Sequence, residues 1–170
     1  MSAESDEEFR EFMRGRWPAM VRLAYGLTGD PGHAEDVAQA AFARAYASWA
    51  RVARTGNPEA YVRRIVINEN NSRFRRRRVT ERLVDAVPEP SGCRPADTAD
   101  SLSDSEALLK ALRRLGPRQR AVIVLRFWMD MSEAETAAAL DCSVGTVKSQ
   151  ASRALAALRG SAELMEGELQ

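Results

Sequence analysis

Three prolines, each directly after a residue that can cap a helix, constrain the fold of this chain more than any other feature. They stand in the pairs Asp30-Pro31, Asn57-Pro58 and Gly116-Pro117. Because proline suits the first position of a helix and Asp, Asn and Gly suit the position before it, a helix should begin at each pair. Two Ser-x-x-Glu capping boxes, Ser103 with Glu106 and Ser132 with Glu135, predict two further helix starts. No stretch alternates between apolar and polar residues as a strand would, so the sequence predicts an all-α fold.

The predicted helices group into two domains separated by a change in composition. From residue 80 to residue 102 the sequence is rich in proline, serine, glycine and acidic residues and has few apolar side chains to bury. We therefore expect two small helical domains, at 5–79 and 103–160, joined by a flexible linker at 80–102. An acidic tail at 161–170 follows the second domain.

Charge is distributed unevenly, although the formal net charge is only +1. Residues 1–78 contain 14 arginines and 10 acidic residues, residues 79–107 contain 2 and 7, and residues 108–170 contain 9 basic and 7 acidic residues. Two mildly basic segments thus flank an acidic one. There is no apolar run of about 18 residues, and the first residues, MSAESDEEF, are acidic, so we expect a cytoplasmic protein with no membrane segment.

Few residues of the types needed for catalysis or metal binding are present. Cys93 and Cys142 lie far apart in the sequence with no Cys-x-x-Cys spacing, and His33 is the only histidine. We therefore expect no metal site, no disulfide and no cofactor. Because paired-carboxylate, Ser/His/Asp and phosphate-loop patterns are also absent from the sequence, we expect that the protein is not an enzyme.

The segment from Ser132 to Leu158 has the pattern of a helix-turn-helix. Small side chains allow the first helix to pack closely, residues 141–143 turn the chain, and an apolar stripe continues along a second helix from about Val144. The other side of the second helix presents donors and acceptors suited to bases and phosphates in the major groove of DNA. These are Thr146, Lys148, Ser149, Gln150, Ser152 and Arg153. The alternative is a solvated polar face on an ordinary helical hairpin.

The C-terminal domain resembles region 4 of the sigma-70 family of transcription initiation factors, in particular its extracytoplasmic-function (ECF) group. The resemblance covers LRRLGPRQRAVIVLRFWMDMSEAETAAALDCSVGTVKSQASRALAALR, and it implies that the last helix recognises the promoter −35 element. Asp141 stands where the family commonly has a turn glycine, and Gln150 stands where a basic residue is frequent. Aspartate tolerates the left-handed conformation better than most residues, so we expect the turn to form.

The segment AEDVAQAAFARAYASW predicts an amphipathic helix with Phe42 on its apolar face and Asp36 and Gln39 on its polar edge. From the residue pattern alone, that edge is a solvated surface. Its Asp-x-x-Gln-x-x-Phe pattern resembles sigma region 2.2, which implies that Asp36, Gln39 and Phe42 contact the β′ clamp helices of core RNA polymerase. Ala40 stands where an acidic residue is common in the family.

The segment NPEAYVRRIVINENNSRFRRRR begins with apolar positions and ends in an arginine-rich run. Five arginines in the six positions 73–78 cannot all be buried, so the run is either a solubilising cluster or a surface that neutralises nucleic-acid phosphates. The segment resembles sigma regions 2.3 and 2.4, which implies promoter melting and recognition of the −10 element. The residues expected to bind the −10 element are Asn68, Asn71, Ser72, Arg73, Arg75 and Arg76. The preceding loop, 51–57, aligns with the family loop that captures a flipped base.

Together these resemblances imply a two-domain sigma factor. Its partners would be promoter DNA and core RNA polymerase, the latter through the β′ clamp helices and the β flap, with the acidic linker threading towards the active-site channel. The family also admits an anti-sigma factor as a partner. Two other interpretations stay open at this point: a helix-turn-helix repressor or activator that binds duplex DNA without polymerase, and an arginine-rich RNA-binding adaptor.

Overall fold

The computed structural model describes residues 2–83 and 102–167, and every regular element within these ranges is a helix. The predicted all-α fold is confirmed. Most of the predicted linker, residues 84–101, lies outside the described residues, as do the last three residues of the acidic tail. No helix in the described ranges is long and apolar enough to cross a membrane.

The N-terminal bundle is built from three long helices and one short turn of helix. These are α1 (Ala3–Thr28), α2 (Pro31–Ala47), α3 (Trp49–Val52) with a 3-10 turn at Ala53–Thr55, and α4 (Pro58–Leu83). Asp30 and Asn57 cap the starts of α2 and α4, since their side-chain oxygens accept from His33 N at 2.8 Å and from Ala60 N at 3.0 Å. Both predicted helix starts are therefore confirmed.

The C-terminal bundle contains four helices and one π-helical turn. They are α5 (Leu102–Arg114), α6 (Pro117–Ile123), the π-helical turn η2 (Val124–Trp128), α7 (Glu133–Leu140) and α8 (Val144–Gly167). The predicted start at Pro117 is confirmed. Because α5 begins at Leu102, the start predicted from Ser103 is slightly late.

The predicted helix-turn-helix is present, and its local chemistry follows the sequence. Ser132 N donates to Glu135 Oε2 at 2.8 Å while Glu135 N donates to Ser132 Oγ at 3.1 Å, which completes the capping box of α7. Asp141 ends α7 with φ 53 and ψ 52, in the left-handed region. The expectation that aspartate can make this turn without glycine is confirmed.

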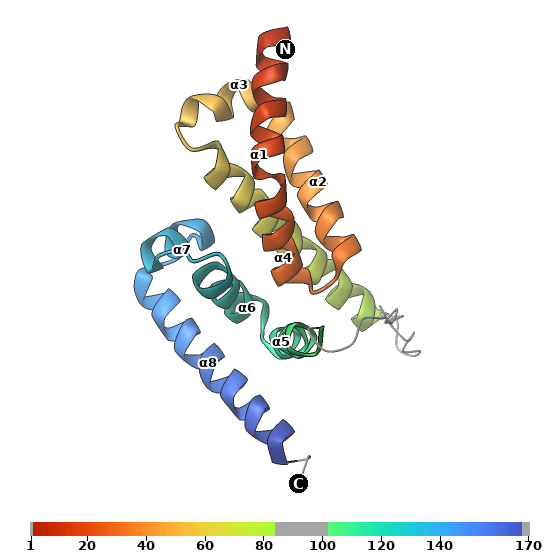
Figure 1. Cartoon of the computed structure of the whole chain (residues 1–170), viewed down its shortest axis with the longest axis vertical. Coiled ribbons are helices and arrows are strands. Elements are labelled where there is room, and N and C mark those ends of the chain that lie inside the picture. Colours follow the sequence, from red (N-terminus) through yellow and green to blue (C-terminus); the bar gives the residue numbers. More distant parts are fainter. Residues whose placement is uncertain (1, 84–101, 168–170) are drawn as a thin grey trace.

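The two bundles pack against each other, with α6 and α7 beside α1 and α4 (Figure 1). Buried side chains of α1, including Leu23 and Leu27, belong to the same apolar core as Leu112 of α5 and Val124 and Leu125 of η2. The rings of Tyr25 and Trp128 meet edge to face, with centroids 6.2 Å apart. The sequence predicted two domains but gave no sign of this contact between them.

Candidate nucleic-acid interface

Helix α8 is buried on one side and exposed on the other. Val147 is fully buried beside Val122 of α6 and Ala137 of α7, and these three side chains fix the angle between the helices of the helix-turn-helix. Ser143 caps the start of α8, because its Oγ accepts from Thr146 N at 3.1 Å. A helix fixed by its apolar side can present its polar side to a groove without rearranging.

The six residues predicted to bind the −35 element divide into two sets. Lys148, Ser149, Ser152 and Arg153 are exposed along α8. Thr146 and Gln150 are half-buried and line a cleft of about 240 Å³ between the two bundles. The cleft is also lined by Asn68 and Asn71 of α4, which are predicted to bind the −10 element.

The other residues predicted to bind the −10 element lie farther along α4. Arg73 and Arg76 line a second cavity of about 360 Å³, together with the ring of Phe74 and the buried end of α1. Arg75 is exposed and Ser72 is half-buried. The arginine run is therefore part of helix α4, where Arg73 and Arg76 line this cavity and Arg75 is exposed.

Asp36 lines this second cavity, whereas Gln39 and Phe42, the other two residues predicted to contact polymerase, line a different one. Its Oδ2 lies 3.9 Å from Arg73 Nη2, in a weak and exposed ion pair. Asp36 and Arg73, which were assigned to different partners, thus pair with each other in the described structure.

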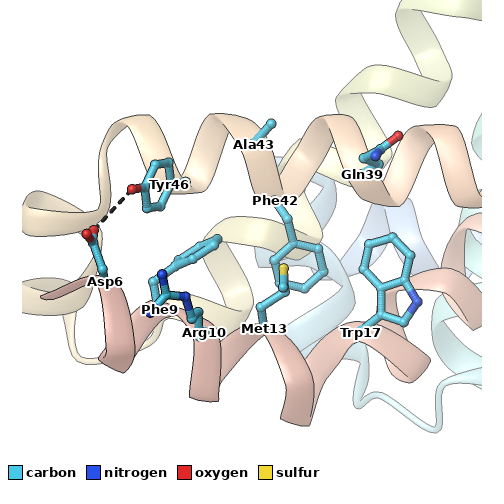
Figure 2. A pocket seen from close by; sticks show the side chains of 9 residues that line it. All are labelled: Asp6, Phe9, Arg10, Met13, Trp17, Gln39, Phe42, Ala43 and Tyr46. Atoms are coloured by element: carbon cyan, nitrogen blue, oxygen red, sulfur yellow. Dashed lines mark hydrogen bonds between the residues drawn. The ribbon is translucent and has the colours of Figure 1, made fainter. Parts of the chain in front are cut away.

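Gln39 and Phe42 line a groove of about 550 Å³ between α1 and α2 (Figure 2). Gln39 is exposed, whereas Phe42 is only 2% exposed and contacts the ring of Trp17 at a centroid distance of 5.7 Å. Phe42 is thus mainly a core residue, and one side of its ring faces the groove. The wall that α1 contributes was not predicted, although the spacing of Phe9, Met13 and Trp17 at every fourth residue could have indicated it.

The far end of the groove is closed by a hydrogen bond. Tyr46 Oη donates to Asp6 Oδ1 at 3.1 Å, and this bond to a carboxylate raises the pKa of Tyr46. Figure 2 shows the pair at the opposite end from Gln39. The groove is therefore apolar along its floor and polar at both ends.

The loop predicted to capture a flipped base uses two of its polar side chains internally. Thr55 Oγ1 donates to Val52 O at 2.7 Å, and Asn57 caps α4. Gly56 has φ 74, which permits the tight turn between them. Arg51 and Arg54 are exposed beside the loop, so the groups available to a ligand here are mainly arginines and backbone.

Within the described residues, no group of three His, Cys, Asp or Glu side chains is placed to hold a metal ion.

Comparison with known proteins identifies the protein family to which both bundles are similar. Family models for sigma-70 region 2 and for sigma-70 region 4 match residues 16–80 and 105–158. The chain is 42% identical over 152 residues to an RNA polymerase sigma-E factor of Streptomyces antibioticus, and the match covers 89% of this chain and 83% of that protein. The chain belongs to the sigma-70 family.

Further similarities place this sigma factor in the ECF group. It is 30% identical over 151 residues to the ECF sigma factor SigW of Bacillus subtilis, a match that covers 82% of this chain and 81% of that one. The sigma factor RpoE of Bartonella quintana, solved with the anti-sigma factor NepR, has a TM-score of 0.76 at 28% identity and covers 91% of this chain and 96% of its own. These names support a sigma factor and not a regulator that acts without polymerase.

Proposed function

We propose that this ECF sigma factor binds core RNA polymerase and directs initiation at promoters by recognising a −10 and a −35 element. The observation that carries the proposal is α8, whose apolar side is buried in the helix-turn-helix core while Lys148, Ser149, Ser152 and Arg153 stay exposed. A recognition helix needs this combination of rigid support and exposed polar side chains to reach base edges. In the free protein Lys148 Nζ lies 3.6 Å from Glu133 Oε2 and Ser149 Oγ donates to Thr146 O at 3.0 Å, so these two side chains would exchange partners on DNA. The protein itself would catalyse nothing and would act in the cytoplasm.

The groove between α1 and α2 is the proposed contact with the β′ clamp helices. An apolar groove between two helices accepts the apolar face of a third helix, and polar residues at its rim fix the register. Gln39 stands at that rim, and Phe42 forms part of the floor (Figure 2). Asp36 would join the contact only after its weak pair with Arg73 is released.

The polar side of α4 is the proposed surface for the −10 element. Asn68 is exposed and Asn71 half-buried at the cleft, while Arg73, Arg75 and Arg76 follow along the helix. Amide groups can bond to unstacked bases, and arginines can neutralise the phosphates of the separated strand. By analogy with the RpoE–NepR complex, an anti-sigma factor is a further proposed partner.

In vitro transcription tests the proposal. Core polymerase purified from a Streptomyces species is mixed with this protein and a library of duplexes with randomised upstream sequence, and the RNA 5′ ends are sequenced. We expect discrete start sites that are absent with core polymerase alone. If the mixture never initiates and the protein alone protects a palindromic duplex, the chain acts as a regulator and the proposal is wrong.

A further inference from the structure

The second cavity, where Arg73 and Arg76 of α4 meet Arg120 of α6, has the size of a small-ligand site. Its lining comes from α1, α2, α4 and α6. Its volume of about 360 Å³ lies near the lower end of the range of about 300–1,000 Å³ in which protein pockets hold small ligands. Any ligand of this cavity is therefore small, and its chemistry must match the side chains that line it.

Positive charge predominates in this lining. Arg73, Arg76 and Arg120 face a single carboxylate, that of Asp36, so three positive charges against one negative leave a net charge of +2 when His33 is neutral. Arg73 and Arg76 are three residues apart on α4 and lie on the same face of the helix. Asp36 is 3.9 Å from Arg73 in an exposed pair that neutralises little of this charge. The cavity should therefore attract an anion.

Arg120 is fixed in place without an acidic partner. Its guanidinium donates to Leu27 O at 3.0 Å and to Leu112 O and Arg113 O, each at 2.8 Å. Carbonyls at helix ends supply only partial negative charge. Burial first, and then the nearby charge of Arg113, lower the pKa of Arg120. A bound anion would compensate the charge that these carbonyls leave.

An aromatic ring and two hydrogen-bonding groups accompany the charges. Phe74 is half-buried and lines the cavity, although its neighbours on α4 are arginines. Inorganic phosphate has no use for a ring, whereas a nucleotide base can stack on one. The carboxylate of Asp36 and the amide of Asn70, also in the lining, can bond to ribose hydroxyls or to a base edge. The combination of charge, ring and hydrogen-bonding groups fits a nucleotide.

The enclosure favours a free nucleotide over a strand of DNA. Arg73 and Arg76 also belong to the proposed −10 surface, but Arg120 lies on α6, and Leu27 is a buried residue at the end of α1. A volume of about 360 Å³ is room for roughly twelve water molecules at about 30 Å³ each. One mononucleotide can contact all four helices in that space, whereas a strand would also have to enter and leave it.

We propose that this cavity binds a nucleoside diphosphate, with the phosphates at Arg73, Arg76 and Arg120 and the base against Phe74. Two phosphate groups carry enough oxygens for three guanidinium groups to donate to. The site goes beyond the proposed function, because recognition of a promoter requires no small ligand.

Isothermal titration calorimetry of the full chain with GDP, ADP and inorganic pyrophosphate tests the proposal. We expect saturable one-to-one binding of at least one nucleotide with a Kd below about 1 mM. That nucleotide should bind at least about tenfold more tightly than pyrophosphate, because only the nucleotide has a base to stack. Absence of saturable binding by both nucleotides would overturn the proposal. Equally tight binding of pyrophosphate would also overturn it, since the cavity would then be an anion site only.

Arg76→Ala tests whether the nucleotide occupies this cavity. Loss of a charge-assisted hydrogen bond should weaken nucleotide binding about tenfold. Arg75→Ala is the matched control, because Arg75 is exposed on the same helix and does not line the cavity. Its affinity should stay within about twofold of the wild type, and circular dichroism measures the helix content of both variants. Equal weakening by the two substitutions would indicate general attraction to the arginine run and contradict a defined site.

Phe74→Leu tests the place of the base. Leucine keeps an apolar side chain on α4 but removes the ring, so nucleotide binding should weaken about tenfold while pyrophosphate binding stays unchanged. Loss of affinity for both ligands alike, or for neither, would contradict the stacking and with it the choice of a nucleotide.

A single strand with the −10 sequence selected from the randomised library is the last ligand to be titrated. If this strand binds and neither nucleotide does, the cavity is part of the promoter surface and the nucleotide site is wrong. Absence of initiation by the wild-type protein would instead contradict the proposed function, while nucleotide binding could still be measured. The two failures are therefore distinguishable.

Discussion

At the scale of single residues, the sequence predicted backbone conformation better than it predicted side-chain burial and contacts. Asp141 was expected to replace a turn glycine, and its φ of 53 confirms this. Phe42 was assigned to a partner, yet it is almost fully buried and shapes a groove. The left-handed preference of aspartate is a local property, whereas the burial of Phe42 depends on Trp17 of another helix. Local properties can be predicted from sequence and such long-range contacts cannot.

Arg153→Ala tests the assignment of α8. Because Arg153 is exposed on the recognition helix, its loss should weaken binding to the selected −35 duplex by about 1–3 kcal/mol if the guanidinium contacts a base. Anisotropy titrations with the selected duplex and with a random duplex measure this. Arg14→Ala, at an exposed position of α1 away from both surfaces, is the control. Equal weakening on both duplexes would show that Arg153 contacts phosphate only.

At the scale of elements, helix starts were predictable and other boundaries were not. The starts at Pro31, Pro58 and Pro117 follow from caps that act within three residues. Helix α4 runs to Leu83, past the predicted domain end at 79, and the arginines in this segment are good helix formers. The π-helical turn, in which Met129 N donates to Val124 O at 2.9 Å, has no sequence signal of its own.

The capping box of α7 should be needed for the stability of the helix-turn-helix. Ser132→Ala removes the acceptor for Glu135 N, and loss of such a cap costs about 0.5–2 kcal/mol. Urea denaturation at pH 7 measures the free energy of unfolding. Ser152→Ala, at an exposed position of α8, should leave that free energy nearly unchanged. A similar loss in both variants would argue against a specific role for the box.

The capping box of α7 also makes the free energy of unfolding depend on pH. Hydrogen bonds from Ser132, the backbone bond first, lower the pKa of Glu135 below its usual 4.5. Because the folded-state pKa is lowered, the contribution of this carboxylate is present above about pH 4.5 and is lost as the pH falls through the lowered value. Glu135→Gln should therefore differ from the wild type in unfolding free energy at pH 6 and approach it towards pH 3. A difference that does not narrow with falling pH would contradict this assignment.

At the scale of the whole molecule, the sequence predicted the parts and missed their packing. The linker composition indicated independent domains, and the family matches of regions 2 and 4 confirm two sigma domains. The contacts between them join residues far apart in the sequence, such as Arg120 with Leu27 and Gly26 with Val124. No periodicity or cap encodes such a contact, because each partner looks like an ordinary helix residue in its own segment.

Arg120 should therefore stabilise the whole molecule and not only α6. Arg120→Met leaves carbonyls at the ends of α1 and α5 without their donor, and we expect a loss of about 2–4 kcal/mol in the free energy of unfolding. The wild type should unfold in one transition, and the variant in two as the bundles uncouple. Arg118→Met, at an exposed position of the same helix, is the control. A single, unshifted transition in Arg120→Met would contradict a shared core held by this side chain.

The central claim is that one chain recognises two promoter elements with two separate surfaces. The most direct test compares the sequences selected for initiation from a randomised library by the wild type, Asn68→Ala and Arg153→Ala. The wild type should select two blocks of preferred sequence, with Asn68→Ala losing preference only in the block nearer the start site and Arg153→Ala only in the farther block. If either variant weakens both blocks equally, or neither block changes, the division of promoter recognition between α4 and α8 is wrong.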